Sequence, residues 1–218
     1  MPEPTAVDFS LYLISDRHIL KDERDLVETV RRALDGGVRA VQLREKDLPA
    51  AALYTLARTL RGLTREAGAL LLINDRIDVA LAVEADGVHL GGASLPVAVA
   101  RQQLGPHRLI GVSTHRADEI ATAAEQGADF VTFGPVYATP SKLPYGEPVG
   151  LGALRQACAT APIPVFALGG VTPAQVPELQ EAGCTRAACI GAILTAADPA
   201  EAARAFLTAL AQQPASRS

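Results

Sequence analysis

Three basic side chains and one carboxylate stand just after apolar runs of this sequence, where buried strands would end. They are Arg44, Lys46, Lys142 and Asp75. Cations alone would bind any anion, whereas cations beside a single carboxylate indicate a metal-bound polyphosphate. Mg²⁺ typically takes one or two protein carboxylates and completes its shell with phosphate oxygens and water. The pattern therefore predicts Mg²⁺ as the cofactor and phosphorylated small molecules as substrates.

The residues that follow the second apolar run alternate in a way that suits a shared binding surface. Successive side chains of a strand point to opposite faces, so Gln42, Arg44 and Lys46 point the same way. The alternative is that 44–47 is a charged loop in solvent. The alternation favours the binding surface.

Glycines near the end of the chain indicate a second kind of anion site. Gly169 and Gly170 follow the seventh apolar run, and Gly191 follows the eighth, just before a short helix. Such glycines expose backbone N–H groups near a helix start, where a phosphate monoester binds readily. Simple turn glycines are the alternative. One metal-assisted and one metal-free anion site together predict a transfer reaction between two phosphorylated partners.

Further polar side chains lie at the ends of apolar runs or in the loop before Lys142. They are Asn74, Ser113, Thr139 and Ser141. His89 differs from these because it lies inside the fourth run. A histidine in that position is more often a hydrogen-bonded core residue than a catalyst.

Eight short apolar runs would form the strands that position these side chains. Runs that are apolar throughout, without alternation, are typical of parallel strands buried on both faces. The expected strands are Leu11–Ser15, Ala40–Leu43, Ala69–Ile73, Gly87–Leu90, Leu109–Val112, Phe130–Phe133, Pro164–Leu168 and Ala187–Ile190.

Eight longer segments between and after these runs have apolar residues three and four apart, as helices do. They are Asp22–Gly36, Pro49–Ala67, Arg76–Glu84, Leu95–Leu104, Arg116–Gln126, Gly150–Thr160, Pro173–Ala182 and Asp198–Gln212. Eight βα units without a linker predict a single (β/α)8 TIM barrel over residues 1–218, with a disordered tail from about residue 212. A doubly wound open sheet is the alternative, but open sheets usually have fewer strands.

Composition excludes several classes of protein. The net charge of −4 and the scattered basic residues give no electrostatic footprint for nucleic acid. No apolar run approaches the length of a membrane span, and the three cysteines lack the spacing of a metal site. These observations predict a cytoplasmic protein that binds neither nucleic acid nor membrane. A homodimer is compatible with these observations.

Taken together, the motifs resemble the thiamine phosphate synthases and their relatives, the thiazole tautomerases. The resemblance runs from about Leu11 to Ile193. The matching strings are "LYLISD", "AVQLREKD", "LLINDRIDVALAVEADGVHLG", "IGVSTH", "GADFVTFGPVYATPSK" and "PVFALGGVTPAQV". The second, third and fifth of these strings are specific to the family in combination.

This resemblance implies a TIM-barrel synthase that joins hydroxymethylpyrimidine diphosphate to a thiazole phosphate and releases diphosphate. It assigns Asp75 to the metal ion and Gln42 and Ser113 to the pyrimidine, with His89 among the substrate contacts. It implies diphosphate contacts from Arg44, Lys46, Asn74 and Lys142. It implies that the loop joining both substrates contains Thr139 and Ser141, and that the thiazole phosphate lies on the backbone of Gly169, Gly170, Ile190 and Gly191.

Two positions depart from the family patterns and keep alternatives open. Synthases usually read H-x-G-Q-x-D after the fourth strand, and here Ser94 stands where the aspartate would help to bind Mg²⁺. Tautomerases carry a proton-shuttling histidine at the position of Pro135. Synthases carry proline there, as this chain does. The synthase is therefore favoured. The alternatives are a tautomerase that uses His89 as its proton carrier, and a non-catalytic protein that binds thiazole phosphate.

Overall fold

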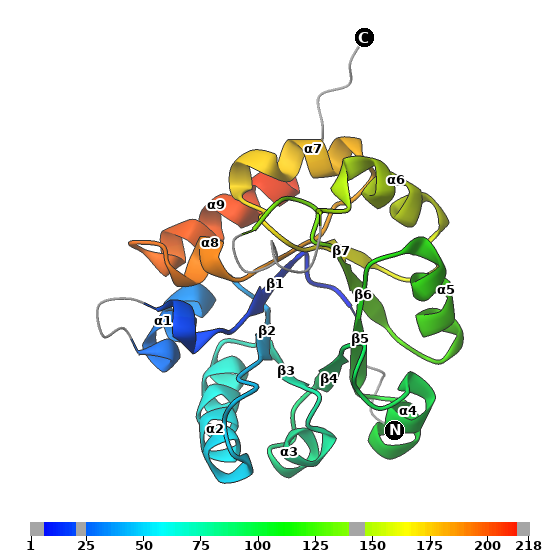
Figure 1. Ribbon diagram of the computed structural model, residues 1–218. Helices are drawn as coiled ribbons and strands as arrows, with labels where there is room; N and C mark the ends of the chain where they lie inside the picture. Colours follow the sequence, from blue (N-terminus) through cyan, green and yellow to red (C-terminus); the bar gives the residue numbers. More distant parts are fainter. Residues whose placement is uncertain (1–6, 21–24, 140–146, 213–218) are drawn as a thin grey trace.

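Eight parallel strands close into a barrel in the computed structural model, which describes residues 7–20, 25–139 and 147–212 (Figure 1). The strands are β1 Leu11–Ile14, β2 Ala40–Leu43, β3 Leu70–Asn74, β4 Gly87–Leu90, β5 Leu109–Thr114, β6 Phe130–Phe133, β7 Val165–Ala167 and β8 Ala187–Cys189. Closure is shown by β1, where Tyr12 pairs with Ala40 of β2 on one side and with Ala188 of β8 on the other. The predicted TIM barrel is confirmed, and the open sheet is excluded.

Helices surround the barrel as an outer ring (Figure 1). The α-helices are α1 Leu26–Asp35, α2 Ala50–Glu66, α3 Ile77–Ala82, α4 Val97–Leu104, α5 Ala117–Glu125, α6 Gly150–Thr160, α7 Val176–Glu181, α8 Gly191–Leu194 and α9 Pro199–Ala211, and the 3-10 helices are η1 Arg17–Ile19 and η3 Pro173–Gln175. The first helix begins later than expected, because Asp25 caps it by accepting a hydrogen bond from Val27 N. In the described part of the chain, no helix is long and apolar enough to cross a membrane.

Alternate residues of each strand face the helices or the barrel interior. In β1, Leu11 and Leu13 belong to the apolar layer under the helices, whereas Tyr12 and Ile14 belong to the cluster inside the barrel. The interior is filled by aromatic rings: the centroid of Phe130 lies 5.4 Å from that of Tyr12 and 5.3 Å from that of Phe166. The barrel is therefore a packed core, and a ligand can approach only its ends.

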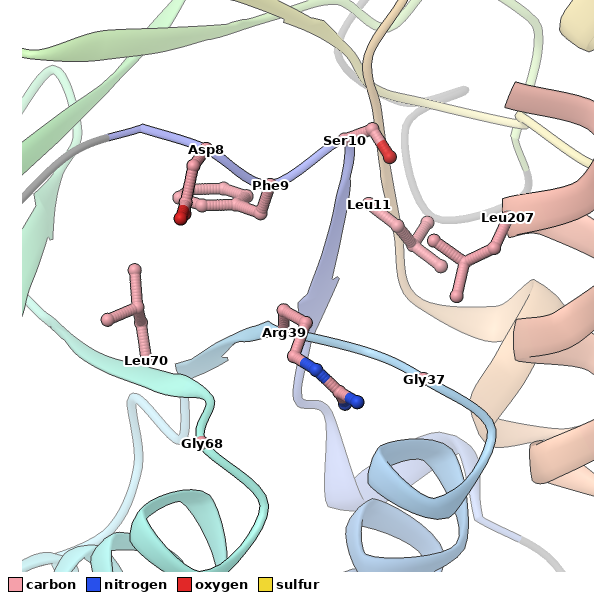
Figure 2. A pocket seen from close by; sticks show the side chains of 9 residues that line it. All are labelled: Asp8, Phe9, Ser10, Leu11, Gly37, Arg39, Gly68, Leu70 and Leu207. Atoms are coloured by element: carbon pink, nitrogen blue, oxygen red, sulfur yellow. The ribbon is translucent and has the colours of Figure 1, made fainter. Parts of the chain in front are cut away.

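A half-open hollow of about 260 Å³ lies at the end of the barrel where the strands begin. Figure 2 shows the side chains around it, among them Leu11 and Leu70, which are the first residues of β1 and β3. Arg39, which also lines it, directly precedes β2. In barrels of this class the chemistry takes place at the opposite face, at the carboxyl ends of the strands.

Gly111 offers a test of how tightly the barrel interior is packed. A Cβ at this position would lie 2.4 Å from Cζ of Phe130 and 2.6 Å from Nδ1 of His89. Both rings are buried and cannot move aside without disturbing their neighbours, so we expect Gly111→Ala to lower the free energy of unfolding by about 1–3 kcal/mol. Urea unfolding measures this effect.

A matched control is Gly62→Ala in helix α2, where a Cβ would meet no atom within 4 Å. That change should stabilise the protein by about 0.5–1 kcal/mol, because alanine favours a helix over glycine. Equal unfolding midpoints for Gly111→Ala and the wild type would contradict the packing argument.

Candidate active site

Polar side chains face the barrel interior at the carboxyl ends of four neighbouring strands, β2 to β5. This end of the barrel is called the mouth below. Asn74 of β3 pairs with His89 of β4, and Ser113 of β5 pairs with Thr132 of β6. Gln42 lies on β2, two residues after the interior residue Ala40. The structure thus brings together residues that the sequence places far apart, as the barrel prediction requires.

A chain of hydrogen bonds joins these side chains beneath the mouth. Gln42 Nε2 donates to the Tyr12 hydroxyl over 3.1 Å, and that hydroxyl lies 3.5 Å from His89 Nδ1. On the other side of the ring, His89 Nε2 lies 3.0 Å from the Ser113 hydroxyl and 3.5 Å from that of Thr132. Gln42, Tyr12, His89 and Thr132 are buried, so the chain fixes their orientations in a low-dielectric environment.

Burial keeps both rings of this chain uncharged. It raises the pKa of Tyr12 well above its ordinary value, and it lowers the pKa of His89 to about 3. Because Tyr12 accepts from Gln42, its own proton is directed to Nδ1 of the neutral imidazole, which leaves the ring proton on Nε2. Ser113 then accepts from His89, and its own proton is available to a ligand. The Gln42 amide is held with its oxygen available as an acceptor.

Arg44 and Asp75 lie close enough to His89 for their charges to act on it. Arg44 lowers the pKa of His89 and Asp75 raises it, both less strongly than burial does. Arg44 is partly exposed, and Lys46, two residues further on, is exposed to solvent. The charges of a cation and a carboxylate therefore act on the same buried ring.

Asp75 and Ser94 converge at the mouth from the loops after β3 and β4. Asp75 has a φ of 60°, a conformation that Asp tolerates better than most residues, and its N–H donates to the carbonyl of His89 over 3.0 Å. Its carboxylate accepts from Asn74 Nδ2 over 2.7 Å and from the Ser94 hydroxyl. The Ser94 oxygen in turn accepts from the N–H of Gly91 over 2.6 Å. Position 94 therefore faces the carboxylate of Asp75, where a second acidic ligand would stand.

The donor set suits a hard cation that takes a single protein carboxylate. Among the described residues, no three His, Cys, Asp or Glu side chains come together as a complete metal site. Asp75 is exposed, and the hydroxyl of Ser94 and the amide of Asn74 lie beside it. One carboxylate with neutral oxygen donors fits Mg²⁺ when phosphate oxygens and water supply the remaining ligands.

The glycines form a second corner of the mouth, consisting of Gly169, Gly170 and the start of α8 at Gly191. The φ angles of Gly169 and Gly170 are 98° and 66°, which other residues rarely adopt. The segment after β6 lies directly on them: Tyr137 N donates to the carbonyl of Gly169 over 3.0 Å, and a Cβ on Gly169 would lie 2.5 Å from Pro135. Two adjacent glycines are thus required for this close approach of two backbones.

Thr139 lies at this glycine corner, because its Cγ2 is 3.4 Å from where a Cβ on Gly170 would stand. Helix α8 begins at Gly191, directly after Ile190. The predicted contacts of Ser141 and Lys142 fall outside the described residues and stay predictions. The predicted substrate contacts of the other site residues also stay predictions, while the structure places those residues at the mouth.

Sequence reasoning missed several residues that support the site. Tyr12 and Thr132 flank His89, and each occupies an interior position of its strand. The alternation of β1 could have found Tyr12, since its neighbours Leu11 and Leu13 face the helices. Glu45 entered the sequence analysis only through the disfavoured alternative of a charged loop over 44–47, and it is only 4% exposed.

The comparisons with known proteins agree with this geometry. A Geobacter sulfurreducens protein provisionally named thiamine-phosphate synthase is 59% identical over 204 residues, which cover 94% of this chain and 95% of that protein. The thiamine-phosphate synthase of Synechocystis sp. is 44% identical over 93% of this chain, which spans 57% of the length of that relative. Thiamine phosphate pyrophosphorylase from Pyrococcus furiosus superposes with a TM-score of 0.83 at 39% identity, covering 92% of this chain and 95% of that chain.

The sequence model of one family, described as thiamine monophosphate synthase, matches residues 11–193. This range contains all eight strands and the residues placed at the mouth. The family match and the similarity to these relatives over most of the chain confirm the resemblance inferred from the motifs. The chain therefore belongs to the thiamine monophosphate synthase family.

Proposed function

We propose that the protein is a thiamine phosphate synthase, a transferase that joins hydroxymethylpyrimidine diphosphate to thiazole phosphate. The observation that carries this proposal is the convergence of Arg44, Asn74 and Asp75 around His89 at the mouth, in a member of this family. Such a site combines fixed positive charge with a metal-binding carboxylate, which is what a departing diphosphate needs.

The reaction breaks the bond between the methylene carbon of the pyrimidine and the diphosphate oxygen. The electron pair leaves with the diphosphate, and the carbocation that remains accepts the lone pair of the thiazole nitrogen in a new C–N bond. Negative charge therefore grows on the diphosphate in the transition state. Fixed cations at that position lower the barrier, and we assign this role to Arg44, Lys46 and Lys142, with Asn74 as a hydrogen-bond donor.

Mg²⁺ is part of the proposal, with Asp75 as its ligand and Ser94 beside it. When bound, the ion would neutralise charge on the diphosphate oxygens. Asn74 donates to one carboxylate oxygen of Asp75 and Ser94 donates to the other, so both residues fix the direction in which the carboxylate points. That is the positioning role of outer-shell partners at metal sites.

Gln42 and Ser113 provide a complementary pair of groups for the pyrimidine. The Tyr12–His89 chain leaves an acceptor on Gln42 and a donor on Ser113. An aminopyrimidine offers the reverse pattern, an amine donor and a ring-nitrogen acceptor. The thiazole phosphate is assigned to the glycine corner, on the backbone of Gly169, Gly170, Ile190 and Gly191, with Thr139 and Ser141 in the loop that contacts both substrates.

The tautomerase alternative is disfavoured because neither Pro135 nor His89 is suited to carry a proton. Pro135 has no group that can exchange a proton. His89 is buried and has a pKa of about 3, and both of its ring nitrogens face other side chains. A base with that pKa removes a proton from carbon poorly at neutral pH. The non-catalytic alternative is left to experiment.

A direct assay tests the proposal. The purified protein is mixed with both phosphorylated substrates over a series of Mg²⁺ concentrations, and thiamine phosphate and diphosphate are quantified. We expect the two products in equal amounts and in a Mg²⁺-dependent way. Absence of product at every Mg²⁺ concentration, with thiazole phosphate still bound in calorimetry, would favour the non-catalytic alternative.

Ser94 provides a test of the metal assignment. We expect Ser94→Asp to lower the Mg²⁺ concentration for half-maximal activity by about tenfold, because a second carboxylate raises the affinity for a divalent cation. Calorimetric titration with Mg²⁺ gives a readout independent of activity, and Ser94→Asn controls for size without adding charge. If the aspartate and asparagine variants share one Mg²⁺ curve, position 94 does not face the metal ion.

A further inference from the structure

We propose that Glu45 is a positioning residue that holds Arg44 and Lys46 at the mouth. This inference rests on the proposed function, in which those two cations bind the diphosphate. Glu45 stands between them in the sequence, yet its side chain is 1% exposed, whereas Lys46 and Asp47 are exposed. A buried carboxylate costs several kcal/mol unless donors surround it, so its burial needs an explanation.

Among the described residues, the donors to the Glu45 side chain come from the segment that follows β1. Its Oε1 accepts from the Ser15 hydroxyl over 2.6 Å and from the N–H of Arg17 over 3.2 Å. Its Oε2 accepts from Arg17 Nη1 over 3.0 Å. One carboxylate thus joins the end of β1 to the end of β2.

Ser15 extends this link to the backbone of Arg44. The Ser15 oxygen accepts from the N–H of Arg44 over 2.9 Å while its proton goes to Glu45, and Ser15 N donates to the carbonyl of Gln42 over 2.9 Å. Ser15 is fully buried. The backbone from the Gln42 carbonyl to the Arg44 N–H is therefore fixed against Ser15, two residues on from the side chain assigned to the pyrimidine.

The direction of Glu45 determines the direction of its neighbours. Successive side chains of an extended segment alternate, so the carboxylate that turns toward β1 sends Arg44 the other way. The electrostatic effect of Arg44 on His89 agrees with this direction. Lys46 lies in the turn that begins at Glu45, where Leu48 N donates to the Glu45 carbonyl over 3.3 Å. Fixing charged groups before the substrate binds avoids reorganisation during the reaction.

Arg17 keeps Glu45 from cancelling the charge that the mouth needs. A carboxylate between two cations would ordinarily pair with one of them. Here the negative charge of Glu45 is paired with Arg17, which also forms an ion pair with the exposed Asp47. Within the described residues neither Arg44 nor Lys46 forms an ion pair, so both can pair with a phosphorylated ligand.

The test compares Glu45→Gln and Ser15→Ala with Asp47→Asn. An amide at position 45 places a donor against the Arg17 guanidinium, and Ser15→Ala removes the link to Arg44. Asp47→Asn removes the other partner of Arg17 and leaves Glu45 in place. The measurements are the affinity for inorganic pyrophosphate with Mg²⁺ by calorimetry, KM for each substrate, kcat and the unfolding midpoint.

For Glu45→Gln and Ser15→Ala we expect about tenfold weaker pyrophosphate binding and a matching rise in KM for the pyrimidine diphosphate. KM for thiazole phosphate should stay within about twofold, and Asp47→Asn should resemble the wild type. Equal changes in both KM values, or a lower unfolding midpoint with unchanged pyrophosphate binding, would show a purely structural role and overturn the proposal.

Ser15→Ala decides the question if Glu45→Gln does not fold, because it leaves the Glu45–Arg17 ion pair in place. The two proposals can also fail separately. If the wild type binds pyrophosphate but forms no thiamine phosphate, the proposed function fails, and the comparison of pyrophosphate affinities still tests Glu45. If the wild type does not bind pyrophosphate, the positioning role is overturned as well.

Discussion

Asp75→Asn should lower kcat by about 100- to 1000-fold at a Mg²⁺ concentration that saturates the wild type. That loss corresponds to about 2.7–4 kcal/mol of transition-state stabilisation, the order found when a group that stabilises developing charge is removed. The change is small in shape: asparagine tolerates the left-handed backbone of this position, where φ is 60°. The variant therefore removes the charge that would bind the metal ion and leaves the loop intact.

Asp78→Asn is the matched control for this experiment. Asp78 is an exposed carboxylate in the same segment, and it forms an ion pair with Arg76. Its replacement should leave kcat within about twofold of the wild type. Steady-state rates over a Mg²⁺ series distinguish the two variants. A similar, small effect of both would remove Asp75 from the metal site.

The fold could be predicted because its signals are local. Each apolar run became a strand within a residue or two, since a run such as Ala40–Leu43 is buried on both faces in any parallel arrangement. The residues at which the strands end were less predictable. The eighth strand was expected to include Ile190, but the backbone turns there, with a ψ of −86°, to begin α8. That turn depends on how the chain packs against the neighbouring strands, which a single sequence does not reveal.

The site was predictable wherever strand alternation alone decides the direction of a side chain. Gln42 and Arg44 were expected to point the same way for this reason. In the structure the Gln42 amide donates to the Tyr12 hydroxyl inside the barrel, and the charge of Arg44 acts on His89. The burial of Glu45 was not predictable, because its partner Ser15 lies 30 residues earlier and meets it only through the register of β1 and β2. The contact between Tyr12 and His89 was not predictable either, since these residues lie 77 positions apart in the sequence. Supporting residues are thus harder to predict than the residues they support.

The neutral state of His89 leads to a prediction about acid stability. An unfolded histidine takes up a proton near its ordinary pKa of 6.5, whereas the folded His89 stays neutral down to about pH 3. Between these values the unfolded state binds more protons, so the free energy of unfolding must fall as the pH is lowered. At about 1.4 kcal/mol for each pKa unit, His89 should account for a loss of about 3 kcal/mol between pH 6.5 and pH 4.

His89→Asn isolates this contribution, because carboxylates that titrate in the same range are common to both proteins. The variant is expected to be less stable at pH 7, since it disturbs the hydrogen-bond chain, but its stability should fall less steeply toward pH 4. Urea unfolding at a series of pH values gives both slopes. Parallel curves for the wild type and His89→Asn would mean that His89 takes up its proton as readily in the folded protein as in the unfolded chain. The fixed proton on Nε2, and with it the donor role of Ser113 toward the pyrimidine, would then have to be abandoned.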